Sequence, residues 1–293
     1  MSPRRSNRRR PAIRFTAATA AALIIGTAAC TLQQQPPPSG SSQAQPADAA
    51  GHDDHMSSMT AADLTSPRIV RRAGQQGVAG LPPSANTAAA RLAASPRHGE
   101  WVTIPWEPGS SDSLMAWIVY PVTERAETPV VVVVHEIFGL STWVRGVADQ
   151  LAADGFIAIA PDLLSRVRGG PSADELTGDS ARKIIRDVSA AERNMGVSAA
   201  ARYAMARPSA ADRYAMIGFC WGGSATWGYA ISGGIAGFAG GVPFYGSPPS
   251  DNGVPAADSL AKIRVPVMLL SGSKDARIGA AMPAIDSIMR AAG

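Results

Sequence analysis

The chain has 293 residues, of which 46% are hydrophobic, so it is long enough to build one large domain around a sizeable core. The formal net charge is +4, but six arginines and no acidic residue lie within residues 1–14 (Arg4, Arg5, Arg8, Arg9, Arg10 and Arg14). Without them the balance is 4 − 6 = −2. This excludes a broadly basic surface, and we expect no nucleic-acid partner.

Residues 1–29 have the pattern of an export signal peptide. The arginines precede the apolar stretch FTAATAAALIIGTAAC at 15–30, which is short for a membrane span. TAAC is similar to a bacterial lipobox, in which Cys30 is lipidated, although Thr27 stands where leucine is usual. Lipidation at Cys30 and simple cleavage near Ala29 both stay open. We expect an exported protein, periplasmic or at the cell surface, whose membrane contact is limited to a lipid anchor at Cys30.

Residues 30–96 are rich in Pro, Gln, Ser and Ala and contain few large apolar side chains, so we expect a disordered tether there. The stretch GHDDHMSSM, with His52 and His55, lies inside it, but its spacing matches no closed metal site. We expect a solvated polar patch and no metal. One folded domain should then occupy residues 97–293.

Alternating strand and helix patterns follow in this domain. WVTIPW and LMAWIVYP predict an antiparallel pair, while Val130–Val134 is continuously apolar, as in a strand buried on both faces. A helix is expected after Ser141 or Thr142 as the N-cap, and a long helical tract from about 173 to 206, broken near Gly178 and Gly196. Further strands are predicted in GFIAIAPDLL, YAMIGFCWGG, FAGGVPFYG and VPVMLLSGSKD. The fold class is therefore α/β, with a mostly parallel, doubly wound sheet and helices on both faces.

The stretch GFCWGG at 218–223 places Cys220 between a predicted strand and a helix, which is the context of a nucleophile elbow. The alternative is a buried structural cysteine in a glycine-rich loop. Glu136, Arg166 and Asp275 also follow predicted strands. Because active groups collect at the carboxyl ends of parallel strands, we expect these four side chains to form a site for acyl transfer.

The chain resembles the dienelactone hydrolases, a family with the α/β-hydrolase fold. The matching pieces lie within residues 100–293 and occur in family order: HEIFG (135–139), APDLLSR (160–166), GFCWGG (218–223), VPFYG (242–246) and GSKD (272–275). HEIFG together with GFCWGG is specific, whereas GSKD alone is a weak motif.

The resemblance implies that Cys220 is the nucleophile and that Glu136 beside it controls the protonation of the thiol. It also implies that the backbone N–H groups of Ile137 and Trp221 form the oxyanion hole. Asp275 matches the acid that orients a catalytic histidine; the alternative is a helix cap near residue 278. For Glu136 the alternative is a surface acid at the end of a strand.

Two further positions follow from the resemblance. Arg166 matches an arginine that pairs with a substrate carboxylate, and this match is compatible with an anionic substrate. Arg168 lies two residues away and makes the assignment to Arg166 less secure. His135 is interpreted as a family variant without a role in the reaction.

One departure from the family pattern concerns the catalytic histidine, which the family carries after the acid. No histidine occurs in residues 276–293, and all four histidines precede Cys220. The last core strand and its helix are expected to be missing too. A sequence truncated at its C-terminus and a genuinely shortened protein are both open.

We therefore expect an exported hydrolase that cleaves a small-molecule ester or lactone through a cysteine nucleophile and an acyl-enzyme, with no cofactor. The alternative is a non-catalytic binding or scaffold lipoprotein that has kept the fold without the triad histidine.

Overall fold

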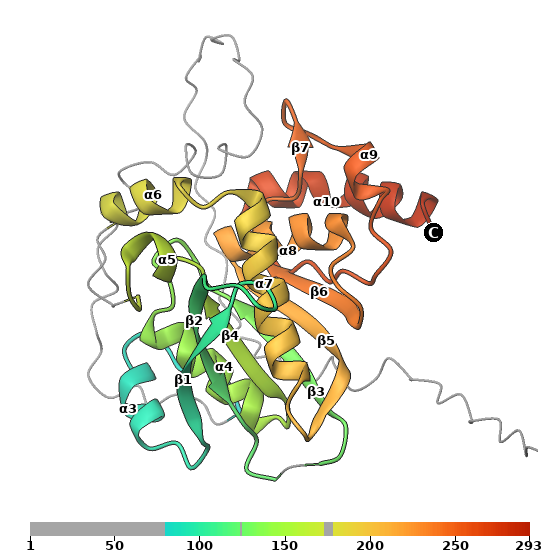
Figure 1. Ribbon diagram of the computed structural model, residues 1–293. Coiled ribbons are helices and arrows are strands. Elements are labelled where there is room, and N and C mark those ends of the chain that lie inside the picture. The colour runs from blue at the N-terminus through green and yellow to red at the C-terminus, as the bar shows by residue number, and fades with distance from the viewer. Residues whose placement is uncertain (1–79, 124, 173–177) are drawn as a thin grey trace, which may run out of the picture. The chain divides into compact units, whose positions relative to one another are not determined.

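The computed structural model describes residues 80–123, 125–172 and 178–293 (Figure 1). The expected signal peptide, the lipidation candidate Cys30 and the polar patch around His52 lie outside the described residues, so they stay predictions. Among the helices that are described, none combines the length and the apolar character that a membrane span needs.

A mostly parallel sheet forms the centre of the domain (Figure 1). Its strand order is β1-β2-β4-β3-β5-β6; β1 and β2 pair antiparallel, as do β2 and β4, and the other neighbours run parallel. The predicted hairpin and α/β class are confirmed. The strands are β1 (Gly99–Pro105), β2 (Ser113–Val119), β3 (Thr128–Val134), β4 (Ile157–Asp162), β5 (Ala210–Phe219) and β6 (Phe238–Phe244).

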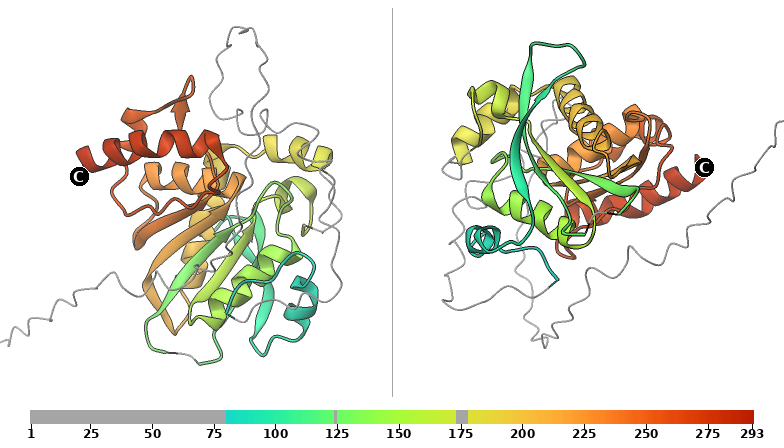
Figure 2. Two further views of the ribbon diagram at one scale, coloured as in Figure 1. Left: turned by 180° about the vertical axis from the view of Figure 1, so that it is seen from behind. Right: turned by 60° about the horizontal axis from the view of Figure 1, so that its bottom comes forward.

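Alternate apolar side chains of the central strands point to opposite faces of the sheet, and helices pack on both faces. Val130, Val132 and Val134 of β3 belong to one core, with residues of α7 (Ala190–Met205) and α8 (Trp221–Ser232). Val131 and Val133 belong to a second core with α4 (Thr142–Ala153), which lies on the opposite face (Figure 2). Continuous burial of β3 therefore follows from a run of valines that has two apolar faces.

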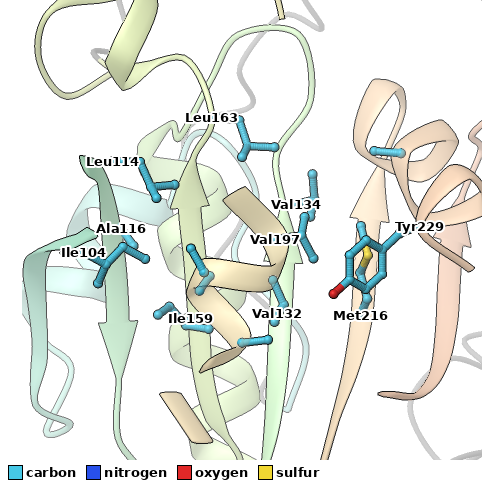
Figure 3. Close-up of a cluster of buried hydrophobic side chains, with 14 of the residues drawn as sticks. Ile104, Leu114, Ala116, Val132, Val134, Ile159, Leu163, Val197, Met216 and Tyr229 are labelled. Atoms are coloured by element: carbon cyan, nitrogen blue, oxygen red, sulfur yellow. The ribbon is translucent and has the colours of Figure 1, made fainter. Parts of the chain in front are cut away.

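Figure 3 shows part of the first core, in which Val132 and Ile159 from neighbouring strands lie beside Val197 of α7. The second core begins at the predicted helix cap: the Ser141 side chain accepts a hydrogen bond from the Val144 N–H at 3.4 Å. Both cores hold the carboxyl ends of β3, β5 and β6 at one edge of the sheet.

The predicted helix break at Gly196 is wrong. Helix α6 (Gly178–Arg186) ends earlier, and α7 begins after Ser189, whose side chain forms a capping box with Glu192. Gly196 lies inside α7, where an added Cβ would stand 2.5 Å from a methyl carbon of Leu163. The glycine permits close packing of the helix on the core instead of ending it.

The folded domain begins earlier than the expected boundary at residue 97. Helix α3 (Ala88–Ala93) lies against α4, and Arg91 donates a hydrogen bond to Gln150 at 3.0 Å. Arg97 forms an ion pair with Asp149 at 2.6 Å. Hydrogen bonds and an ion pair from polar side chains hold this segment against α4. The expectation of disorder, which rested on the scarcity of large apolar residues, therefore does not apply to it.

After β6 the chain forms short elements and a final helix. Residues 265–270, predicted as a strand, make two isolated parallel bridges to β6 (Gly241 to Val267 and Phe244 to Leu270). The remaining elements are α5 (Ser165–Arg168), β7 (Ser250–Asp251), β8 (Val254–Pro255), α9 (Ala257–Leu260) and α10 (Ala276–Ala291).

Candidate active site

Cys220 occupies a sharp turn between β5 and α8. Its backbone has φ 55° and ψ −115°, a conformation that residues other than glycine rarely adopt. Holding a residue in such a conformation costs about 1–3 kcal/mol. The turn is held because the Cys220 N–H donates to the Phe244 carbonyl at 3.1 Å and the Cys220 carbonyl accepts from the Ser224 N–H at 3.0 Å. Such retained strain is typical of a functional turn.

The glycines around Cys220 are required by close backbone contacts. A Cβ at Gly218 would collide with the carbonyl group of Gly222, and one at Gly222 would collide with the carbonyl oxygens of Val134 and His135. At Gly223 it would lie 2.6 Å from the Phe244 carbonyl oxygen. The pattern G-x-C-x-G-G therefore lets α8 begin directly against the ends of β3 and β6.

The environment of Cys220 keeps its thiol protonated at neutral pH. Burial is the main cause that raises the pKa of Cys220 to about 11, and the charge of Glu136 raises it further. The Trp221 backbone N–H, which hydrogen-bonds the sulfur, and the Arg277 guanidinium lower the pKa. The Trp221 N–H thus faces the Cys220 sulfur. The role of the Ile137 N–H, in the turn after β3, stays a prediction.

Glu136 and Tyr245 share the surroundings of the thiol. Burial raises the pKa of the Glu136 carboxyl above its ordinary value. Burial also raises the pKa of the Tyr245 phenol, and the charges of Glu136 and Cys220 add to this effect. Tyr245 follows β6 at φ 40°, and its N–H donates to the Leu270 carbonyl at 2.7 Å. Glu136 is half-buried, which is less exposure than the alternative of a surface acid implies.

His135 has both ring nitrogens engaged away from Cys220. Nδ1 lies 2.6 Å from the Glu136 carbonyl oxygen, and Nε2 accepts from the Leu163 N–H at 3.1 Å, so the proton is assigned to Nδ1. The ring is fully buried and stacks on Trp221 at 5.6 Å. Burial lowers the pKa of His135, although Asp162 opposes this effect. His135 is therefore a neutral structural residue.

Asp275 caps α10 and pairs with a neighbouring arginine. Its side chain accepts from the Ile278 N–H at 3.4 Å and forms an ion pair with Arg277 at 3.1 Å. The cap is the alternative that the sequence left open. Within the described ranges the histidines are His98 and His135; His98 pairs with Glu100 on β1 at 3.6 Å. No described histidine contacts Asp275.

Arg166 is not among the groups that act on the thiol. It lies in α5 with its side chain 46% exposed, and it pairs with Glu192 at 2.9 Å and Asp112 at 3.4 Å. Its guanidinium lies 5.7 Å from the Trp106 ring centre. Two carboxylates already balance the charge that was expected to meet a substrate carboxylate.

The sequence did not single out Tyr245 or Arg277. Each position nevertheless has a sequence feature that could have marked it as a candidate site residue. Tyr245 directly follows β6, so the strand-end rule that selected Cys220 applies to it as well. Arg277 places a cation in the first turn of α10, where the helix macrodipole disfavours one.

The chain is similar to a family model and to curated proteins that are named as lactone hydrolases. A model of the dienelactone hydrolase family matches residues 114–293. The chain is 29% identical over 203 residues to the "Putative carboxymethylenebutenolidase" of Salmonella typhimurium, covering 68% of this chain and 74% of that protein. It is 32% identical over 206 residues to the "Probable 2-oxo-3-(5-oxofuran-2-ylidene)propanoate lactonase" of Bradyrhizobium sp, covering 66% and 73%.

A solved structure shares the fold. The crystal structure titled "Putative Dienelactone Hydrolase" from Klebsiella pneumoniae superposes with a TM-score of 0.55 and 27% sequence identity. The match covers 67% of this chain and 82% of that chain.

Proposed function

This chain belongs to the dienelactone hydrolase family, and on that premise we propose that it hydrolyses a carboxylic ester or lactone through a covalent intermediate on Cys220. The observation that carries the proposal is the strained turn at Cys220, whose thiol interacts with the charge of the half-buried Glu136 carboxyl and with the Trp221 N–H. An inert structural cysteine would not require this backbone conformation.

In the acylation step the sulfur attacks the substrate carbonyl carbon while the thiol proton moves to the Glu136 carboxylate. The carbonyl oxygen becomes an oxyanion that accepts hydrogen bonds from the Trp221 and Ile137 N–H groups. When the C–O bond breaks, the leaving alkoxide takes the proton from Glu136, and a thioester remains on Cys220. From a lactone, the alcohol stays attached to the acyl group.

In the deacylation step Glu136 takes a proton from water, and the hydroxide attacks the thioester carbonyl. The carboxylic acid product leaves, and the Cys220 sulfur recovers its proton from Glu136. The raised pKa of Glu136 supports this role, because it makes the carboxylate a stronger base than an ordinary glutamate. It also reduces the difference between the pKa of Glu136 and the pKa of the Cys220 thiol.

The names of the relatives support a lactone as the substrate class, and simple esters share the chemistry of its carbonyl group. An anionic substrate would compete with Asp112 and Glu192 for Arg166. We therefore propose a neutral lactone or small aryl ester for the first assay, with an anionic lactone as the comparison.

The experiment that tests this function is hydrolysis of a small aryl ester by the purified protein, combined with mass analysis of the Cys220 peptide. Turnover with an acyl group on Cys220 supports the enzyme. A thiol that reacts with a labelling reagent, together with no hydrolysis of esters or lactones, supports the non-catalytic scaffold instead.

We also propose export, which residues 1–30 support through their arginines, their apolar stretch and the lipobox-like TAAC. If Cys30 is lipidated, cells expressing the whole chain should incorporate labelled fatty acid into the protein, and Cys30→Ala should remove the label. A soluble product that begins after Ala29 would show simple cleavage, and protein retained whole in the cytoplasm would contradict export.

A further inference from the structure

The first turn of α10 lies at the same edge of the sheet as Cys220. Hydrogen bonds connect the strand ends in sequence: the Cys220 N–H donates to the Phe244 carbonyl at 3.1 Å, and the Tyr245 N–H donates to the Leu270 carbonyl at 2.7 Å. From Leu270 the chain needs only a short turn to reach Asp275, whose N–H donates to Gly272 at 3.0 Å. The start of α10 is thereby fixed next to the site.

Three side chains interact electrostatically with the sulfur, each from a different part of the fold, and a fourth pairs with one of them. Glu136 after β3 and Tyr245 after β6 are groups whose ionised forms oppose a thiolate. Arg277 on α10 is the cation that acts on Cys220, and Asp275 holds the Arg277 guanidinium at 3.1 Å. A negative sulfur next to Glu136 requires such a counter-charge.

Arg277 also breaks a local rule of helix construction. A cation in the first helical turn faces the positive end of the macrodipole, and Asp275 offsets this by capping the helix and pairing with the guanidinium. A side chain that violates a local preference while its charge acts on a group at a strained turn is expected at a functional position.

We propose that Arg277 is a positioning residue for the reaction, which stabilises the Cys220 thiolate and is itself oriented by Asp275. The Asp275 carboxylate then holds a cation beside the nucleophile. Because a guanidinium stays protonated, Arg277 stabilises charge without taking a proton, and Glu136 remains the base. This inference rests on the proposed function of Cys220, but its test measures the thiol itself.

The test is the pH dependence of Cys220 alkylation by iodoacetamide, followed on the peptide that carries Cys220 so that Cys30 does not contribute. In Arg277→Gln the midpoint should rise by roughly half to one pH unit, because an opposite charge near a buried group shifts its pKa by about one unit or more and solvent screens a side chain that is 49% exposed. The midpoint is the better quantity, since thiolate nucleophilicity increases with pKa and offsets part of the change in rate.

The matched control is Arg290→Gln, which removes an arginine from the same helix together with its pair to Asp286 at 2.8 Å. Its midpoint should equal that of the parent protein. Arg277→Lys should raise the midpoint less than Arg277→Gln does, because lysine returns a positive charge but lacks the planar guanidinium. Arg277→Met, which keeps the aliphatic stem, serves as a second neutral variant if Arg277→Gln loses its helical circular dichroism.

An unchanged midpoint in folded Arg277→Gln or Arg277→Met, or an equal shift in Arg290→Gln, would overturn the inference. The outcome is separable from the proposed function. A midpoint shift in a protein that hydrolyses no ester supports the role of Arg277 and contradicts the enzyme, whereas hydrolysis with no shift supports the enzyme alone.

Discussion

Cys220→Ala is expected to abolish ester hydrolysis and leave the domain folded. Loss of the attacking sulfur removes the covalent route, so turnover should fall by at least about a thousandfold. Alanine keeps the same Cβ at φ 55°, and the residue is only 8% exposed, so we expect stability to change by about 1 kcal/mol. Hydrolysis and thermal unfolding, measured on the same preparation, check both statements.

Two further variants complete this comparison. Cys220→Ser should keep at most traces of activity, because a hydroxyl is a much weaker nucleophile without strong base activation. Cys30→Ser, which removes the other cysteine of the chain, should keep full activity in the purified protein. Turnover near the parent value in Cys220→Ala would exclude Cys220 as the nucleophile.

Glu136→Gln should change thiol reactivity and catalysis in opposite directions. The Glu136 charge raises the pKa of Cys220, so its removal lowers that pKa below about 11, and Cys220 should be alkylated faster near neutral pH. Ester hydrolysis should fall roughly a hundredfold, because the base that accepts the thiol proton and activates water is lost. Alkylation rates and turnover over one pH series measure the two effects.

The same variant has a predicted effect on stability. Burial raises the folded-state pKa of Glu136, so the carboxyl contributes most at low pH and its contribution is lost as pH rises through that pKa. Glu136→Gln should therefore unfold at a higher temperature than the parent protein at neutral pH. Glu107→Gln, at an exposed position, serves as the control. If hydrolysis rises together with thiol reactivity, Glu136 restrains the thiol and is not the base.

Local patterns were sufficient for much of the fold and for the centre of the site. The run Val130–Val134 predicted a strand with two buried faces, and Ser141, one of the two cap candidates, is the cap. The glycines beside Cys220 predicted the elbow, because the short contacts at Gly218 and Gly222 require the absence of a Cβ. In these cases one local requirement decides both the residue and the conformation.

Positions that depend on distant partners could not be predicted in this way. Gly196 has the composition of a helix breaker, but its role is to let Leu163 approach α7. Arg166 follows a strand as expected, yet Glu192 and Asp112 hold its guanidinium. The role proposed for Arg277 depends on the tertiary position of α10 next to the strand ends; its place in the first turn of the helix marks it as unusual but does not show which group it faces.

The most direct measurement is the mass of the Cys220 peptide after rapid quenching of a reaction with a small aryl acetate. A thiolate nucleophile should give an acetyl group on this peptide within the first turnover, with a burst of the aryl alcohol when deacylation is slower. The modification should be absent in Cys220→Ala and should be released by hydroxylamine, as a thioester is. Steady hydrolysis with the acetyl group on another residue, or with the same rate in Cys220→Ala and no acyl-Cys220, would contradict a cysteine-based hydrolase.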